Sequence, residues 1–481
     1  MEFLSILLGV IGILFGLFGI KWENIRDYLR RFYNKPVDFT FENDNFARDT
    51  IKYRFRNIMN NINNKYEDAI VSLGKKTIER PLDYDEYRES VFQDPYYSNL
   101  TENESDRKLL DDFYTQYNPE NNPDYKNTKK FLEKAPFIDV EHAFYFYIID
   151  ELTRKLSKDV KQYMSAGTSG VFDPYKLMKK GSIINDLKKG LCKEAHKSSR
   201  ILMGLQAVTR FIDNDFSAEY TVNDLVEDSI IQTLNSNSYD LSQLPGMERR
   251  KIERLQEDTK GAKELTNYLL TLERGTELCI NYLVDNAGVE FFSDLVLGYL
   301  LLKKSEYRIK KIIYHVNILP IFVSDVIEND LDYTFKVIED NLDLISIGKK
   351  EKKKALIALQ EIKKIFIDKE ACIEADFIWN MPTPYKSISR KREIFENTSD
   401  LLIVKGDLNY RRLCGDKTYH YTKKIDKLTD YIKCPTLVVR CFKSNLVLDY
   451  STKRYKQNTI EDRDWRTNGK YGVIKFMKKN G

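Results

Sequence analysis

Short apolar runs in the second half of the chain, separated by helical patterns, constrain the fold most strongly. Each run is rich in Val, Ile and Leu, and turn residues or charges stand beside it. The runs cover residues 278–285, 310–316, 319–325, 401–407 and 435–440. Strands that alternate with helices are typical of a parallel sheet covered by helices. The sequence therefore predicts a three-layer α/β/α fold with a mostly parallel, Rossmann-like sheet.

The first half of the chain has a different pattern. It is helical and polar and contains no clear strand, with apolar residues at helical spacing in residues 47–72, 140–155 and 195–212. We therefore expect a mainly helical subdomain over residues 39–240 and an α/β subdomain over residues 241–481. With 481 residues, of which 42% are hydrophobic, the chain is large enough for both cores.

The start of the chain is the most apolar part of the sequence. Residues 3–20 carry no charge and are followed by Lys21 and Trp22. As a helix this run would reach about 27 Å, close to the roughly 30 Å of a hydrocarbon core. The alternative, a cleaved signal peptide, would have a basic start and a small-residue cleavage site, and both are missing. We therefore expect a transmembrane anchor over residues 1–21 and a juxtamembrane stalk over residues 22–38.

The charges beside this run predict an orientation. Arg26 and Arg30 follow the run, whereas no basic residue precedes it. The positive-inside rule then predicts a single-pass membrane protein whose body lies in the cytoplasm. Gly12 and Gly16 form a GxxxG pattern, which would allow the anchor helices of a homo-oligomer to pair.

Charge and composition exclude several classes of protein. Lys and Arg number 77 against 73 Asp and Glu, a net charge of +4, which argues against a nucleic-acid-binding protein. The 6 cysteines are scattered and the 4 histidines show no ligand spacing, so neither a disulfide framework nor a zinc site is expected. The chain also contains no GxSxG, HExxH or Walker A pattern.

Oxygen-bearing side chains stand at the ends of the predicted strands. Asp285, Asp325 and Asp407 each end an apolar run, and Asn286 follows Asp285. Ligands of parallel sheets bind outside the carboxyl ends of the strands, so we expect these side chains to converge. Such oxygen ligands suit Mg²⁺ or Mn²⁺ and, less selectively, Co²⁺ or Ni²⁺. For any single Asp a helix N-cap is the alternative. The pattern predicts a divalent metal site at Asp285, Asn286 and Asp325.

A polar segment follows the fourth apolar run. Residues 405–413 (KGDLNYRRL) place a Lys, an Asp, an Asn and two Arg around Gly406. Glycine lets backbone N–H groups approach an anion, and Arg or Lys adds charge-assisted donors. Arg440, which ends the next run, and Lys443, which follows it, could reach the same pocket. The alternative is a β-turn with ordinary surface charges.

Two segments imitate a phosphatase nucleophile motif of the form DxDx. They begin at Asp213 and Asp330. That chemistry requires the first Asp directly after a buried strand, whereas both segments follow helical or polar sequence. We expect both to be acids on helix surfaces.

Several segments resemble the damage-control phosphatases, in the branch also called acidic-residue methyltransferase-like. The resemblance is carried in order by LVDNAGVEFFSDL, LPIFVSD, DFIWNMP, SDLLIVKGDLNYRRLCGD and WRTNGKYGVI. RCFK, at residues 440–443, stands where the branch has RTxK, with Cys441 in place of the Thr. The resemblance covers most of residues 39–481, and the predicted anchor lies outside it.

This resemblance implies an enzyme, a divalent-metal-dependent phosphatase that hydrolyses small phosphometabolites. Sugar phosphates such as fructose 1-phosphate or fructose 6-phosphate are the typical substrates. The implied catalytic and metal-binding residues are Asp285, Asn286 and Asp325, with Mn²⁺ as the first choice of metal. The implied substrate-binding residues are Asp407, Leu408, Asn409, Tyr410, Arg411 and Lys443.

Two other functions stay open at this stage. One is carboxyl methyl transfer from S-adenosylmethionine to protein acids, although no glycine-rich loop follows the first clear strand and methyl transfer needs no metal. The other is a membrane-tethered binding module that has lost catalysis, although every polar residue proposed for metal and phosphate is present.

Overall fold

The fold is known from a computed structural model. It describes residues 36–72, 82, 84–85, 87, 100–118, 122–125, 127–155, 173–189, 199–236, 256–273, 276–345, 347–397 and 400–479. The boundary predicted between residues 240 and 241 lies outside this set.

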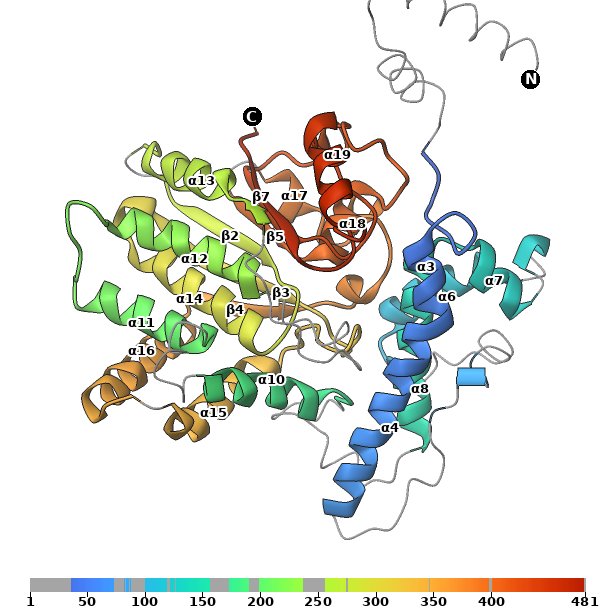
Figure 1. Ribbon diagram of the computed structural model, residues 1–481, viewed down its shortest axis with the longest axis horizontal. Coiled ribbons are helices and arrows are strands. Elements are labelled where there is room, and N and C mark those ends of the chain that lie inside the picture. The colour runs from blue at the N-terminus through green and yellow to red at the C-terminus, as the bar shows by residue number, and fades with distance from the viewer. Residues whose placement is uncertain are drawn as a thin grey trace, which may run out of the picture.

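A seven-stranded sheet runs through the molecule in the order β1-β7-β6-β5-β2-β3-β4 (Figure 1). Every neighbouring pair is parallel except β6 and β7, which are antiparallel. The prediction of a mostly parallel α/β sheet is therefore confirmed. The strands are β1 Gln256–Asp258, β2 Leu278–Leu283, β3 Ile309–Val316, β4 Ala371–Ala375, β5 Leu401–Lys405, β6 Thr436–Cys441 and β7 Tyr471–Met477.

The central strands are apolar throughout because both of their faces are buried. In β5, Leu402 and Val404 enter one hydrophobic core, whereas Leu401 and Ile403 enter the core on the opposite face. This alternation follows from the two-residue period of a strand.

Long helices cover one face of the sheet. They share a hydrophobic core with the strands, and Figure 1 shows α11, α12 and α14 lying alongside one another. Three of them, α10 to α12, come from the predicted helical subdomain and contact α14. The helices are α10 Lys176–Lys189, α11 Arg200–Ile212, α12 Val222–Ser236, α13 Lys260–Leu270, α14 Val289–Lys303, α15 Asp330–Asn341 and α16 Lys349–Ile367.

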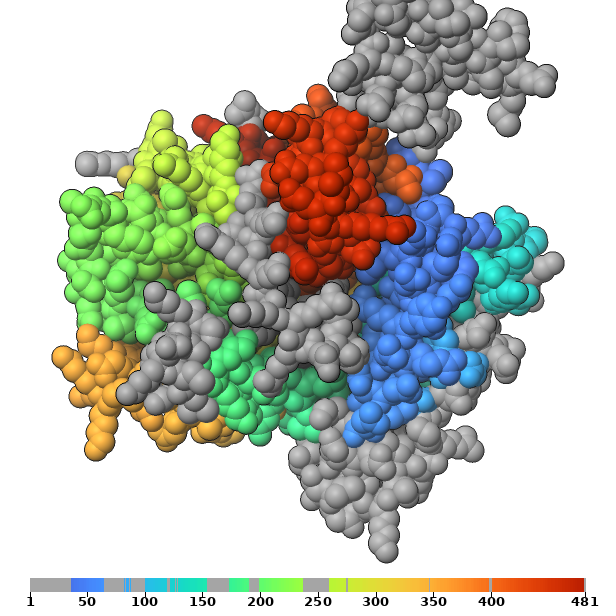
Figure 2. All heavy atoms as spheres, in the orientation of Figure 1, coloured from blue at the N-terminus to red at the C-terminus, as the bar shows by residue number. Residues whose placement is uncertain are grey.

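The first helices of the chain gather at one side of the molecule (Figure 1) and share a core with the other face of the sheet. Figure 2 shows this N-terminal part beside the C-terminal segments, where Asn445 Nδ2 donates to Asp44 Oδ2 at 2.7 Å. The elements are α3 Asn45–Asp49, the π-helix η1 Thr50–Arg54, α4 Phe55–Ser72, α6 Glu104–Thr115, η3 Pro123–Tyr125, α7 Thr128–Lys134 and α8 Phe137–Lys155.

Short helices complete the fold, most of them in the C-terminal part. They connect the strands and carry part of the polar edge of the sheet. They are η7 Ser305–Tyr307, η8 Leu342–Leu344, η9 Phe377–Asn380, η10 Tyr385–Ser387, α17 Glu393–Glu396, α18 Asp407–Cys414, η11 Ile425–Lys427 and α19 Thr452–Glu461.

The strand predicted over residues 319–325 is wrong, because these residues form a loop. Both edges of β3 are already paired, with β2 on one side and β4 on the other, so the sheet has no position for another strand there. The chain turns instead, with positive φ angles of 54° at Phe322 and 69° at Val323.

The predicted membrane topology also needs correction. Among the residues that the structure describes, no helix is long and apolar enough to cross a bilayer. The apolar helix α14, with 15 residues, would reach only about 22 Å and is buried in the protein core. The predicted anchor, residues 1–21, lies outside the described residues, as does most of the stalk. The prediction of a single-pass membrane protein with a cytoplasmic body is therefore withdrawn, and with it the pairing of anchor helices.

Candidate functional site

The order of strands reverses between β2 and β5. From β2 the chain adds β3 and β4 on one side, and it then adds β5 and β6 on the other. In parallel sheets a crevice forms at such a point, outside the carboxyl ends of the strands. Asp285 follows β2 and Asp407 follows β5. The topology therefore brings these two acids to one edge of the sheet.

A cavity lies at this edge, and most of the predicted site residues line it. Its walls include Asp285, Asn286, Asp325, Asp407, Leu408, Arg411 and Lys443, together with Phe46, Arg54, Glu141 and Phe322. A neighbouring cavity shares Asp285, Asp325 and Leu408 and adds Asn409. Tyr410 lines neither cavity. The structure thus brings together eight of the nine residues that the sequence singled out.

The side chain of Asn286 is held from both ends. Its Nδ2 donates to Asp285 Oδ2 at 2.9 Å and to Glu290 Oε2 at 2.9 Å. Its Oδ1 accepts from the hydroxyl of Ser324 at 2.6 Å. Because two carboxylates occupy the amide hydrogens, the oxygen is the atom that remains able to act as a ligand.

A buried lysine stands behind this amide. Lys405, which is fully buried at the end of β5, donates from Nζ to Glu290 Oε1 and lies 3.5 Å from Asp294 Oδ1. Burial alone would lower the pKa of Lys405, but the carboxylates of Asp294 and Glu290 raise it above its ordinary value. Burial raises the pKa of Asp294 to about 7 in spite of Lys405. The sequence analysis placed Lys405 among anion-binding groups, whereas the structure makes it the counter-ion of two core acids.

Gly406 brings the turn after β5 against the acid after β2. Its φ angle of +93° is a conformation that favours glycine. A Cβ built at this position would lie 2.1 Å from Cγ of Asp285. The carboxylate of Asp285 therefore occupies space that any other residue at position 406 would fill.

Asp407 is fixed by donors from β6 and from the segment that follows it. Its Oδ1 accepts from Nε of Arg440 at 2.7 Å and from the backbone N–H of Lys443 at 3.1 Å. Arg440 is fully buried, and its guanidinium lies 4.1 Å from the ring centroid of Tyr410. Arg440 was expected to reach the pocket, but it does not line the cavity. It supports the site by binding the carboxylate of Asp407, which does line the cavity.

The next residues of α18 have structural partners. Asn409 Nδ2 donates to the carbonyls of Val284 and Lys405, at 2.8 Å each, and its Oδ1 accepts from Tyr385. Asn409 thereby ties the ends of β2 and β5 together. Tyr410, which is 4% exposed, packs under Arg440.

Arg411 meets carboxylates from two parts of the chain. It binds Asp416 in a bidentate manner, at 3.1 Å and 2.9 Å, and its Nη1 donates to Glu141 Oε2 at 2.6 Å. Burial raises the pKa of Glu141 above its ordinary value, while Arg411 and Arg54 act in the opposite direction.

The helical half supplies residues that the sequence analysis missed. Glu141 comes from α8, Arg54 ends the π-helix η1, and Phe46 lies in α3. Glu141 gives no distinct local signal, because it stands among other polar residues, with Asp139 two positions before it and His142 directly after it. π-Helical turns are frequent at functional sites, but the sequence gives no sign of one here.

Asp325 is joined to the Asp285 segment by backbone contacts. Val326 N–H donates to the carbonyl of Asp285 at 3.0 Å, and Ala287 N–H donates to the carbonyl of Ser324 at 2.6 Å. The carboxylate of Asp325 accepts from Asn317 Nδ2 at 2.8 Å. The loop therefore lies against the segment that follows β2, held through the backbone of Ser324 and Val326 on either side of Asp325.

These residues fit a hard divalent cation. The carboxylates of Asp285 and Asp325 and the carboxamide of Asn286 line a single cavity, and the missing side chain of Gly406 leaves room for the carboxylate of Asp285 itself. Within the described part of the chain, no three His, Cys, Asp or Glu side chains form a metal-holding group by themselves. A metal here would therefore depend on the oxygen of Asn286 as well as on Asp285 and Asp325.

The two DxDx segments have different environments. Asp213 is exposed at the end of α11, as expected for a surface acid. Asp330 is 1% exposed at the start of α15 and pairs with Lys179 at 2.7 Å, so its expected surface position is wrong.

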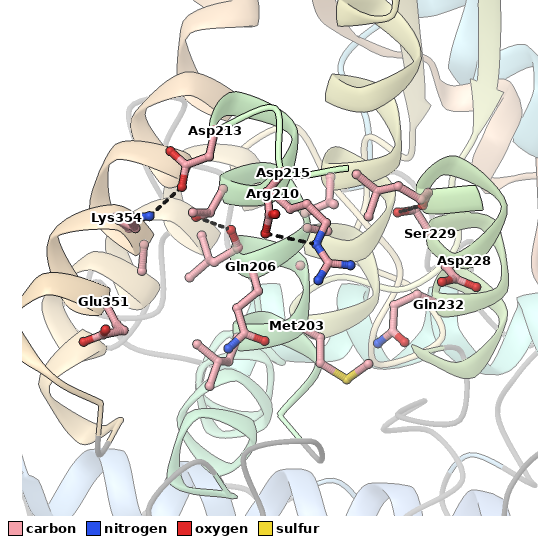
Figure 3. A pocket seen from close by; sticks show the side chains of 18 of the residues that line it. Met203, Gln206, Arg210, Asp213, Asp215, Asp228, Ser229, Gln232, Glu351 and Lys354 are labelled. Carbon is pink, nitrogen blue, oxygen red and sulfur yellow. Dashed lines mark hydrogen bonds and ion pairs between the residues drawn. The ribbon is translucent and has the colours of Figure 1, made fainter. Parts of the chain in front are cut away.

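A larger cavity, about 500 Å³, lies away from the site along α11. Figure 3 shows two ion pairs among the side chains that line it: Lys354 pairs with Asp213, and Arg210 pairs with Asp215. None of the predicted site residues lines it.

Comparison with known proteins agrees with this geometry. Residues 76–457 match the family described as the damage-control phosphatase ARMT1-like domain. The chain belongs to this family. The matched region contains every predicted site residue, and the resemblance predicted from sequence motifs is confirmed.

Curated relatives include three proteins named damage-control phosphatase ARMT1. The protein of Danio rerio is 30% identical over 202 residues, which are 41% of this chain and 42% of that protein. That of Xenopus tropicalis is 29% identical over 213 residues (43% and 46%), and that of Homo sapiens is 23% identical over 216 residues (44% and 46%). The similarity thus spans less than half the length of these ARMT1 relatives.

Proposed function

We propose that this protein is a divalent-metal-dependent phosphatase that hydrolyses small phosphometabolites, in particular sugar phosphates such as fructose 1-phosphate or fructose 6-phosphate. One observation carries the proposal: Asp285, Asn286 and Asp325 line the same cavity as Arg411 and Lys443. A cation site that faces basic side chains is what phosphoryl transfer requires. The names of the relatives support the same activity.

Asp285, Asn286 and Asp325 would hold the metal, with Mn²⁺ as the first choice. When bound, such a cation neutralises charge on phosphoryl oxygens and lowers the pKa of a water molecule. The contacts of Asn286 with Glu290 and Ser324 keep its oxygen oriented without rearrangement.

The other residues bind and orient the substrate. Lys443 and Arg411 would stabilise the negative charge that spreads over the phosphoryl oxygens. Arg411 is already paired with Asp416 and Glu141, so it is held rigid and donates from a fixed position. Asp407 is fixed through Oδ1, and its second oxygen can accept a hydrogen bond from a substrate hydroxyl.

Phosphate release from a panel of phosphometabolites tests the proposal. We expect the full chain to release phosphate from sugar phosphates with Mn²⁺ and to stop when a chelator is added. Asp285→Asn should remove this activity, whereas Asp213→Asn, at the exposed end of α11, should leave it unchanged. Unchanged turnover by Asp285→Asn, or methyl incorporation from S-adenosylmethionine without phosphate release, would contradict the proposal.

A further inference from the structure

The loop that carries Asp325 has an unfavourable backbone. Phe322 and Val323 have consecutive positive φ angles of 54° and 69°, and such a conformation costs about 1–2 kcal/mol for each residue that has a Cβ. Surrounding contacts must therefore hold the loop in place. From α8, the rings of His142 and Tyr145 pack on Phe322, with centroids 4.9 Å and 4.6 Å away.

A buried lysine of a second helix also contacts the loop. Lys179 of α10 is 1% exposed, and its Nζ donates to the backbone carbonyl of Asp325 at 3.0 Å. The same nitrogen lies 2.7 Å from Asp330 Oδ2 and 3.0 Å from Asp173 Oδ2. Both acids are buried too.

These contacts enclose the segment after Asp325. Asp330 Oδ2, besides pairing with Lys179, accepts from the backbone N–H of Ile327 at 2.9 Å. Helix α10, which carries Lys179, also lies close to the segment that contains Asp285 and Asn286. A Cβ at Gly288 of that segment would lie 2.6 Å from Oγ of Ser182 in α10. Helix α10 therefore contacts both stretches of chain that would hold the metal.

We propose that Lys179 is a positioning residue for the metal site, which holds the carbonyl of Asp325 so that its carboxylate faces Asp285 and Asn286. The proposal rests on the proposed function, since it assumes that these residues bind a cation. Groups that orient metal ligands typically change the affinity for the metal by about 10- to 100-fold when they are removed.

A purely structural role must be separated from positioning. Lys179→Met alone would leave Asp173 and Asp330 buried without a cation, which destabilises the fold whatever the role of Lys179. The double variant Lys179→Met/Asp330→Asn reduces this problem, because it keeps the net charge of the cluster at that of the wild-type protein and leaves only Asp173 without a cation beside it. The carboxamide introduced at position 330 can still accept from the N–H of Ile327. Lys304→Met is the matched control, because Lys304 is 8% exposed and pairs with Glu306 away from the cavity.

Two measurements on the full chain test the inference. Calorimetry gives the affinity for Mn²⁺ alone, and thermal unfolding shows whether each variant is folded. We expect the dissociation constant for Mn²⁺ to rise about 10- to 100-fold in the double variant and to stay unchanged in Lys304→Met. Lys179→Arg, which keeps the buried charge but cannot place a nitrogen where Nζ lies, should also bind Mn²⁺ more weakly.

The outcomes distinguish this inference from the proposed function. If the wild-type protein binds no Mn²⁺, the proposed function fails and the inference fails with it. If the wild-type protein binds Mn²⁺ and both Lys179 variants bind it equally well, only the positioning role is overturned. If the double variant does not fold, the affinity of Lys179→Arg decides, and an unchanged value overturns the inference.

Discussion

Gly406 and Asp285 are so close that a Cβ at position 406 would lie 2.1 Å from Cγ of Asp285. The two residues follow neighbouring parallel strands, β5 and β2. Their contact therefore joins the proposed metal-binding half of the site, after β2, to the proposed substrate-binding half, after β5. A side chain at position 406 would force these halves apart.

Gly406→Ala should lower the rate of phosphate release by about 100-fold, because a displacement of about 1 Å is enough for such a loss. The matched control is Gly415→Ala at the other end of α18. Gly415 also has a positive φ, 90°, but its Cβ would meet only Tyr419 Oη at 3.6 Å. Both variants should lose stability through backbone strain. At a temperature where both proteins are folded, only Gly406→Ala should lose activity. Equal kinetic constants in the two variants would contradict this prediction.

The polar edge of the sheet could be predicted from sequence because its signal is local. Apolar runs of strand length mark buried strands, and acids directly after them lie at the carboxyl ends. Asp285 and Asp407 were located in this way. The same reasoning also places Asp325 at this edge, but its run is a loop and not a strand. The pattern of residues 319–325 cannot reveal this, because it does not show that both edges of β3 are already paired.

The remaining walls of the site could not be predicted in this way. Glu141 meets Arg411 across 270 positions of sequence, and no local pattern records such a contact. The same holds for Lys179. Its sequence context is that of an ordinary charged residue on a helix, and only the structure shows that its Nζ donates to the carbonyl of Asp325. The spacing of residues along the sequence reveals helices, strands and the ends of strands. Contacts such as Glu141–Arg411 and Lys179–Asp325 depend instead on how the helices pack against the edge of the sheet.

Lys405→Met should lower the free energy of unfolding by about 3–5 kcal/mol, because it leaves the buried carboxylates of Glu290 and Asp294 without their cation. Chemical denaturation at neutral pH measures the change. Lys310→Met is the control, since Lys310 forms an exposed pair with Glu277 and should leave the unfolding midpoint nearly unchanged. A Lys405→Met protein as stable as the control would show that the ion pair is not needed for folding.

His315 should make the protein sensitive to acid. Burial lowers the pKa of His315 from 6.5 to about 3, so the folded protein binds fewer protons than the unfolded chain between these values. Stability is then fully present above pH 6.5 and decreases as the pH falls toward 3. In His315→Gln the decrease over this window should be smaller by a few kcal/mol. Unfolding curves measured from pH 7 to pH 4 test this, and parallel pH profiles of both proteins would contradict it.

Arg440→Lys should reduce phosphate release by about 10- to 100-fold, because a lysine cannot replace the three contacts of the guanidinium. Nε binds Asp407 at 2.7 Å, Nη1 binds the carbonyl of Leu446 at 2.6 Å, and Nη2 binds Ser444 Oγ at 2.9 Å. Without them Asp407 keeps only the longer hydrogen bonds from the N–H of Lys443 and the hydroxyl of Ser444, at 3.1 Å and 3.3 Å. Its carboxylate is then held less firmly toward the cavity, so both kcat and the affinity for substrate should fall.

Arg412→Lys separates this effect from a general loss of packing. Arg412 is as buried as Arg440 and also makes three contacts, but all of them are to backbone carbonyls, those of Ile378, Trp379 and Thr383. The two variants should therefore lose similar amounts of thermal stability. Only Arg440→Lys should lose kcat/KM at a temperature where both proteins are folded. If Arg412→Lys loses as much, the arginines act through stability alone, and Asp407 does not depend on Arg440 for its position.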